Sequence, residues 1–132
     1  MLRLKSKKLL SLIGATALVM TFSISAFAGS SSKSVPGYNT LSGSLDGNGN
    51  YVTSVSRNPD NAYLTIKGVI ENRNGSQIST QQEIDSDRGE TYHSGSWDWI
   101  PSDAYALYGT HGVQGGSRYG ARAVYTYSRA NT

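Results

Sequence analysis

From residue 38 to residue 129 the chain alternates between apolar and polar side chains, and clusters of Gly, Asn, Asp and Pro interrupt the alternation. A period of two is that of an extended strand with one buried face, whereas a helix would repeat its apolar residues every three or four positions. No segment after residue 38 shows a convincing helical spacing. Parallel strands need crossover connections, which are usually helices, so the sequence predicts an antiparallel all-β fold.

The boundaries of the strands follow from the turn residues. Residues 46–50 (Asp-Gly-Asn-Gly-Asn) join alternating strands at 41–45 and 51–55 in a predicted hairpin, and the next turn is at 58–61. The strongest strand is 63–71, with Leu64, Ile66, Gly68 and Ile70 facing the core. The turn at 72–75 and the strands at 78–84, 91–97, 105–113 and 118–129 complete the pattern. Seven or eight short strands of this kind indicate an antiparallel β-sandwich or a small barrel.

The last predicted strand has two very different faces. Tyr119, Tyr125 and Tyr127 lie on one face, and Arg118 and Arg122 lie on the other. All nine Tyr and both Trp follow residue 28, where aliphatic residues are few, so aromatic rings must supply much of the buried area. We therefore expect the three tyrosines of this strand to point toward the core and Arg118 and Arg122 to point outward.

Residues 1–28 have the pattern of a secretory signal peptide. Four basic residues among the first eight precede an apolar run, and Ala26-Phe27-Ala28 supplies the small residues of a cleavage site. A retained membrane anchor is the alternative, because residues 9–27 are just long enough to span a bilayer. We expect cleavage, a flexible segment at 29–37 and one β-sandwich domain at 38–132. The protein is then secreted and extracellular, with association to the cell wall as one destination.

Charge and cysteine content exclude several functions. Four of the twelve basic residues lie in the leader, which leaves eight basic against nine acidic residues in the remainder. A nucleic-acid partner is not expected, because binding to phosphates needs clustered basic residues in the folded part. The chain has no cysteine, so it has no disulfide, thiolate metal site or cysteine nucleophile.

The sequence predicts no catalytic residue, no metal site and no cofactor. Residues 46–50 resemble the start of a calcium-binding loop, but Tyr51 stands where Gly is required and Arg57 where Glu is required. Asp85, Asp87 and Glu90 are close enough in sequence to share a cation. A hydrolase would need a pair of carboxylates such as Glu83, Glu90, Asp98 or Asp103, and nine carboxylates allow many such pairs.

The two histidines, His93 and His111, fall on different predicted strands, while zinc sites favour three or four ligands. We interpret His111, on a glycine-rich strand, as a structural residue with satisfied hydrogen bonds. His93 is expected to be half exposed.

The segment Trp97-Asp98-Trp99 is the main candidate for a binding site. Alternation would place both indoles on one side of an extended strand, where they could stack on sugar rings beside Tyr92 or Tyr105. The same segment could settle at a lipid headgroup interface, or both indoles could belong to the core. Arg118 and Arg122 could meet anionic wall polymers or lipids, or form a solvated face. The predicted ligand-binding residues are Trp97, Asp98, Trp99, Tyr92, Tyr105, Arg118 and Arg122.

Three stretches carry a family resemblance: 58–65 (Asn-Pro-Asp-Asn-Ala-Tyr-Leu-Thr), 104–116 and 119–127 (Tyr-Gly-Ala-Arg-Ala-Val-Tyr-Thr-Tyr). They resemble uncharacterised small secreted β-rich proteins of Gram-positive bacteria. A fainter likeness is to lactococcin-type bacteriocins, which are exported, cysteine-free β-sandwiches that end in an aromatic strand. The second resemblance implies binding to a cell-wall precursor and interference with wall assembly.

Taken together, these features predict a secreted, non-enzymatic β-sandwich that binds wall glycan or polysaccharide at the bacterial cell surface. The alternatives are a bacteriocin-like antagonist of the cell envelope and, less favoured, a hydrolase that uses Asp or Glu. A membrane contact without a spanning segment is compatible with the first two.

Overall fold

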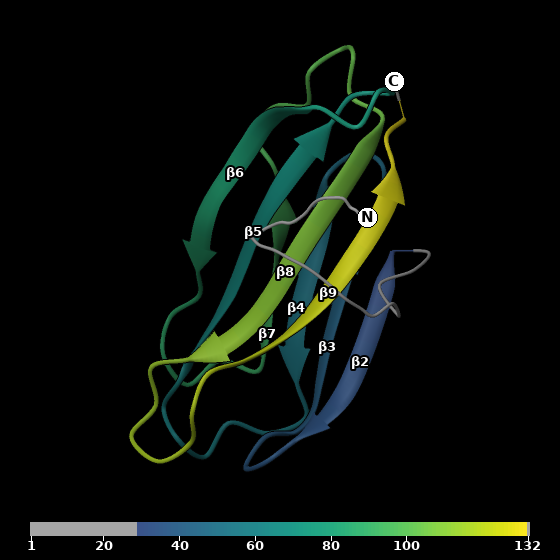
Figure 1. The fold of residues 1–132 in the computed structure, drawn as a ribbon. Helices are drawn as coiled ribbons and strands as arrows, with labels where there is room; N and C mark the ends of the chain where they lie inside the picture. Colours follow the sequence, from purple (N-terminus) through teal and green to yellow (C-terminus); the bar gives the residue numbers. More distant parts are fainter. Residues whose placement is uncertain (1–28, 132) are drawn as a thin grey trace.

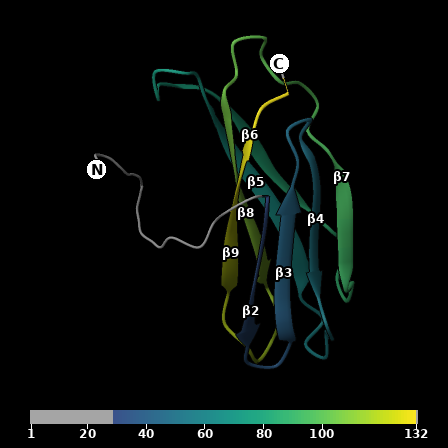
Figure 2. The same cartoon turned by 90° about the vertical axis from the view of Figure 1, so that its right-hand side faces the viewer.

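The computed structural model describes residues 29–131, which form two four-stranded antiparallel sheets packed face to face (Figure 1). The strands of the first sheet, in spatial order, are β2 (Ser30–Val35), β3 (Asn39–Leu45), β4 (Asn50–Val55) and β7 (Tyr92–Ser96). Those of the second are β6 (Gln77–Asp85), β5 (Tyr63–Glu71), β8 (Ala106–Gln114) and β9 (Arg122–Arg129). Figure 2 shows the sheets as two layers. The predicted antiparallel β-sandwich is confirmed, and the predicted signal peptide at 1–28 lies outside the described residues.

In two of the predicted hairpins, the side chain of the first turn residue accepts backbone hydrogen bonds that close the turn. The carboxylate of Asp46 accepts the N–H groups of Asn48 and Asn50, each at 2.9 Å, between β3 and β4. Asn72 Oδ1 accepts the N–H groups of Asn74 and Ser76 in the same way between β5 and β6. Asp and Asn favour turns because their side chains can replace backbone acceptors in this manner.

The alternation read from the sequence gives the correct buried face for three strands. Tyr63–Glu71 is confirmed as a strand with the predicted bounds, and it lies between β6 and β8 in the second sheet. The predicted inward positions are all buried: Leu41, Gly43 and Leu45 on β3, Tyr51, Thr53 and Val55 on β4, and Leu64, Ile66, Gly68 and Ile70 on β5. Thr65, on the other face of β5, is buried as well.

The core consists of two apolar clusters with a polar layer between the sheets. One cluster is built around Tyr38, Leu41 and Leu64, and the other around Ile66, Trp97 and Leu107. Buried Thr53 and Thr126 come from opposite sheets, and both bond the ring of His111. A Cβ atom on Gly43 would lie 2.3 Å from His111 Cγ, so the absence of a side chain at Gly43 makes room for the imidazole.

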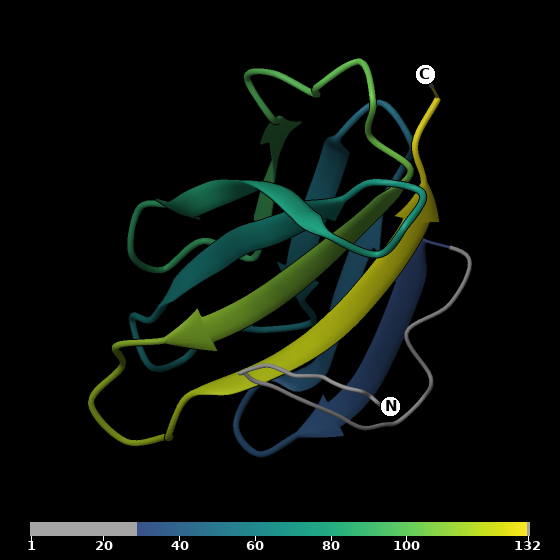
Figure 3. The same ribbon diagram turned by 45° about the horizontal axis from the view of Figure 1, so that its top comes forward.

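The segment 29–37, predicted to be flexible, contains strand β2 instead. Each residue from Ser30 to Val35 pairs with a residue of β3, and Gly29 N–H donates to the Tyr127 carbonyl at 2.7 Å. Figure 3 shows β2 beside β9 at the edge where the two sheets meet. Main-chain hydrogen bonds order this polar strand, and they leave no signal in apolar periodicity.

The prediction for the last strand is correct for its arginines and for Tyr119 but wrong for the tyrosines of β9. Arg118 and Arg122 are exposed and Tyr119 packs against the core, as expected. Val124 and Thr126 are buried, whereas Tyr125 is 57% exposed and Tyr127 is half-buried. The strand also begins at Arg122 rather than at residue 118. Thr126 points inward because the buried imidazole of His111 needs a polar partner there.

The turns gather at two ends of the sandwich. The upper end in Figure 1 holds the turns at 46–49 and 72–75, the β7–β8 connection and the end of β9. Hydrogen bonds join these segments, including Trp97 N–H to Gly49 O and Asn131 N–H to Gly47 O. The lower end holds the loops at 56–62, 86–91 and 115–121.

Candidate functional site

The two tryptophans of the predicted site do not share a surface. Trp97 is 4% exposed and packs in the core, where its ring edge lies against Gly68, while Trp99 is 66% exposed. Strand β7 ends at Ser96 and the chain bends at Asp98, so the alternation of an extended strand does not apply here. The expectation that both indoles lie on one side is therefore wrong, and only Trp99 is available to a ligand.

The other predicted site residues are divided between the two ends. Tyr105 lies at the upper end, in the same connection as Trp99. Tyr92 pairs with Ser54 near the lower end of the first sheet, and Arg118 N–H is bound to Asp60 in the lower loops. Arg122 begins β9 at that same end. The seven predicted residues thus do not form one site.

The outer surface of the second sheet carries three tyrosines that we call the tyrosine face: Tyr108, Tyr125 and Tyr127. Tyr108 on β8 pairs directly with Tyr127 on β9, and their ring centres are 5.4 Å apart. Tyr125 lies two residues before Tyr127 on the same face of β9 and pairs with Thr110 of β8. Burial, followed by the nearby Glu71 carboxylate, raises the pKa of Tyr108, which keeps this phenol neutral. Exposed apolar patches of this kind mark interaction sites more often than isolated apolar residues do.

A depression of about 400 Å³ lies at the upper end, and we call it the arginine pocket. The guanidinium carbon of Arg73 lies 4.8 Å from the ring centre of Tyr105, and that of Arg129 lies 3.9 Å from it. The complete lining is Asn72, Arg73, Asn74, Ser102, Asp103, Ala104, Tyr105, Arg129 and Ala130. Two cations held on one aromatic ring form a concentrated positive charge at the surface.

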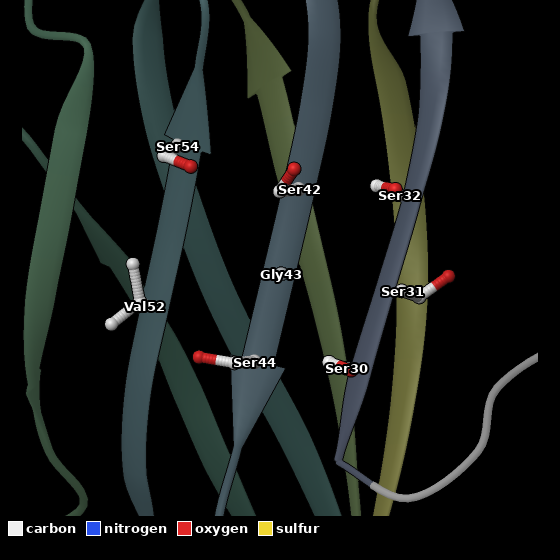
Figure 4. Close-up of a pocket in the computed structure, with 8 residues that line it drawn as sticks. All are labelled: Ser30, Ser31, Ser32, Ser42, Gly43, Ser44, Val52 and Ser54. Atoms are coloured by element: carbon white, nitrogen blue, oxygen red, sulfur yellow. The ribbon is translucent and has the colours of Figure 1, made fainter.

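A second depression, of about 410 Å³, lies on the outer surface of the first sheet (Figure 4). Its lining is Ser30, Ser31, Ser32, Ser42, Gly43, Ser44, Val52 and Ser54, spread over β2, β3 and β4. These small side chains provide hydroxyl groups but no ring and no charge. The surface is therefore chemically uniform and less specific than the tyrosine face.

His111 is a structural residue with satisfied hydrogen bonds, as the sequence predicted. The Thr53 hydroxyl donates to the Thr65 carbonyl at 3.0 Å, so His111 Nδ1 must donate to Thr53 and Nε2 must accept from Thr126. Burial lowers the pKa of His111 from 6.5 to about 4. His93 is half-buried, and its Nε2 atom lies 3.1 Å from the Ile84 carbonyl.

Asp60 is the acceptor that holds the lower loops together. Its buried carboxylate accepts from the Tyr38 hydroxyl at 3.1 Å, from Ser117 Oγ at 3.0 Å and from the N–H groups of Arg118 and Tyr119. Burial raises the pKa of Asp60, but these hydrogen bonds outweigh it and lower the pKa below its usual value. Burial and the same carboxylate raise the pKa of Tyr38 to about 12. The network is internal, so it is structural.

No metal cluster is found in the part of the chain that the structure describes. Among residues 29–131, no three His, Asp or Glu side chains are grouped so that they could hold an ion. Asp85, Asp87 and Glu90 therefore do not form the shared cation site that their spacing allowed. Residues 29–131 also include no apolar helix of membrane-spanning length.

Comparisons with known proteins give no match: no protein-family model, no curated protein and no solved structure is similar to this chain. The assignment of the candidate functional residues above is therefore based on geometry. Sequence reasoning missed Arg73 because it lies in a turn, and it placed the tyrosines of β9 in the core. The alternate spacing of Tyr125 and Tyr127 was the one available signal, because it puts two rings on one face of a strand.

Proposed function

We propose that the protein is a secreted, non-enzymatic binding protein that attaches to wall glycan or polysaccharide at the bacterial cell surface. The observation that carries this proposal is the tyrosine face on the outer surface of the second sheet. The export pattern of residues 1–28 supports its location outside the cell.

The geometry of the tyrosine face suits a chain of sugar rings. Tyr125 and Tyr127 lie two residues apart on one strand, which separates their positions by about 6.6 Å, and Tyr108 extends the surface to the next strand. Pyranose rings present C–H groups that pack on aromatic faces, and phenol hydroxyls can bond sugar hydroxyls at the same time. Tyrosine also loses little side-chain entropy on binding, because it has only two rotatable side-chain angles.

Co-sedimentation with purified, insoluble cell-wall polysaccharide tests this proposal. The protein without residues 1–28 should sediment with the polymer, and Tyr125→Ala and Tyr108→Ala should each weaken binding about tenfold, which corresponds to about 1.4 kcal/mol. Tyr92→Ala is the matched control, because Tyr92 is 60% exposed but lies on the first sheet. Unchanged binding in the Tyr125 and Tyr108 variants would exclude the tyrosine face as the contact.

The exposed Trp99 favours a second candidate function, that of a bacteriocin-like antagonist of the cell envelope. Its ring is 66% exposed in a connection at the upper end, where Arg73 and Arg129 also lie. Tryptophan beside cationic residues is typical of contacts with lipid headgroups. Under this alternative, the protein binds anionic vesicles and inhibits growth of susceptible cells, and Trp99→Ala abolishes both effects.

A further inference from the structure

The arginine pocket is built by the ends of three neighbouring strands. Tyr105 N–H donates to the Glu71 carbonyl at 2.8 Å, and Ala130 N–H donates to the Tyr105 carbonyl at 2.9 Å. These two hydrogen bonds tie the ends of β5 and β9 to the residue that precedes β8. Arg73 follows Glu71 by two residues and Arg129 directly precedes Ala130, so the backbone brings both arginines to the same ring.

The charge of the pocket is not balanced by the side chains of residues 29–131. Both guanidinium groups lie on the Tyr105 ring, so their separation cannot exceed the sum of their distances to its centre. Two positive charges this close repel each other, and holding them together costs free energy. Neither arginine forms an ion pair with a carboxylate of residues 29–131. Asp103 is the one carboxylate among the residues that line the pocket, so Arg73 and Arg129 together leave one positive charge in excess.

Further hydrogen-bond donors surround the two cations. Asn72 Oδ1 is already occupied by two backbone N–H groups, so its amide NH₂ is left to donate. Asn74 and Ser102 add an amide and a hydroxyl to the lining. The pocket therefore combines an excess of positive charge with several uncharged donors, which is the composition of a site for an oxyanion.

A phosphate group fits this arrangement better than a carboxylate. One guanidinium group satisfies both oxygens of a carboxylate through two parallel hydrogen bonds. Two guanidinium groups, one from the turn after β5 and one from β9, offer more donors than a carboxylate can accept, whereas the oxygens of a phosphate point in tetrahedral directions and can meet both. We propose that the arginine pocket binds a phosphate group of a ligand. This site adjoins the tyrosine face, because Arg129 follows Tyr127 by two residues on β9, but it consists of other residues and does not depend on the proposed function.

Titration of the ¹⁵N-labelled protein with inorganic phosphate and with glycerol phosphate, followed by NMR, tests the proposal. The expected result is saturable shifts confined to the amides of residues 72–74, 102–105 and 129–130. Arg73→Gln and Arg129→Gln should each weaken binding about tenfold, because each removes a charge-assisted pair of hydrogen bonds. Arg122→Gln is the matched control: Arg122 is exposed on the same strand as Arg129 but at the opposite end. It should leave the dissociation constant within about twofold.

A Tyr105→Leu variant tests the geometry of the pocket without changing its charge. Loss of the ring that holds both guanidinium groups should weaken phosphate binding severalfold while both arginines remain. The proposal is overturned if no saturable shift occurs, or if Arg122→Gln weakens binding as much as Arg73→Gln, since the effect would then come from net charge alone. Thermal unfolding of each variant shows that the fold is retained.

The source of the phosphate is distinguished by two further arms. Vesicles of phosphatidylglycerol in phosphatidylcholine present it as a lipid headgroup, and soluble poly(glycerol phosphate) presents it in a polymer. If the protein binds the vesicles or the polymer and Arg129→Gln loses that binding, the result supports the phosphate site and identifies the source of the phosphate. If Arg129→Gln and Arg73→Gln both still bind the vesicles and the polymer, the proposal is overturned.

Discussion

His111 Nε2 lies 2.7 Å from the Thr126 hydroxyl on the inner side of the second sheet, where both residues are fully buried. The contact connects two neighbouring strands of the second sheet, and Thr53 on β4 brings the first sheet to the other nitrogen of the ring. The imidazole thus bonds both sheets at once. Burial lowers the pKa of the ring to about 4, so it is neutral at pH 7 and Nε2 accepts from the Thr126 hydroxyl while Nδ1 donates to Thr53.

Acid should destabilise the fold through His111. Its pKa of about 4 in the folded protein lies below the ordinary value of 6.5, so the unfolded chain binds the extra proton first as the pH falls. The free energy of unfolding should therefore fall between pH 6.5 and pH 4, by about 3 kcal/mol in total. Urea unfolding at several pH values measures this change.

A His111→Gln variant should lose most of that pH dependence although it is less stable at pH 7, and His93→Gln should keep it. An unchanged pH dependence in His111→Gln would show that other groups cause the effect.

Gly43→Ala should destabilise the protein, because its new Cβ would lie 2.3 Å from His111 Cγ. Overpacking of this kind typically lowers the free energy of unfolding by about 1–3 kcal/mol. Gly120→Ala is the control, since the nearest atom to its Cβ would be Arg122 Nη1 at 3.4 Å. Chemical denaturation compares the two variants, and equal stabilities would argue against the close packing of β3 on His111.

Asp60→Asn should loosen the lower loops. One oxygen of Asp60 accepts from the Ser117 hydroxyl and the Arg118 N–H, and the other accepts from the Tyr38 hydroxyl and the Tyr119 N–H. Asn keeps only one accepting oxygen, so one of these two backbone N–H groups loses its best partner. We expect a lower unfolding temperature and faster hydrogen exchange at that amide. Asp87→Asn, at an exposed position, removes the same charge and should change neither. Equal exchange rates in both variants would contradict a structural role for Asp60.

The two tryptophans should be distinguishable by fluorescence. Trp99→Phe leaves only the buried Trp97, so the emission should shift to shorter wavelength and acrylamide should quench it weakly. Trp97→Phe leaves only the exposed Trp99, with the opposite spectrum, and should also lower stability because a core ring becomes smaller. Identical quenching of the two variants would show that the indoles share one environment.

Sequence periodicity was sufficient for most of the fold and for little of the site. Strands β3, β4 and β5 have alternating apolar residues and Asp- or Asn-led turns, so their buried faces and their C-terminal ends could be predicted, although β3 and β4 begin earlier than predicted, at Asn39 and Asn50. On β9 the alternation separates the tyrosines from Val124 and Thr126 but does not say which set is inside. That choice depends on His111, which lies on a different strand and needs Thr126 as its partner.

The candidate site could not be predicted because it depends on contacts between distant segments. The arginine pocket brings Arg73 and Arg129 to Tyr105 through hydrogen bonds at three strand ends, and no local pattern encodes that approach. The prediction for Trp97 and Trp99 failed because it extended the alternation of β7 past its end at Ser96. Asp60 was expected in a turn, whereas its carboxylate bonds residues almost sixty positions later.

The central claim, that the tyrosine face binds a wall glycan, is tested most directly by mapping the contact surface. A soluble wall-glycan fragment would be titrated into the ¹⁵N-labelled protein and the backbone amide shifts followed by NMR. The account predicts saturable shifts on β8 and β9 around Tyr108, Tyr125 and Tyr127, and none on the serine-lined surface of β3 and β4. Shifts confined to the first sheet, or no saturable shift at all, would contradict it.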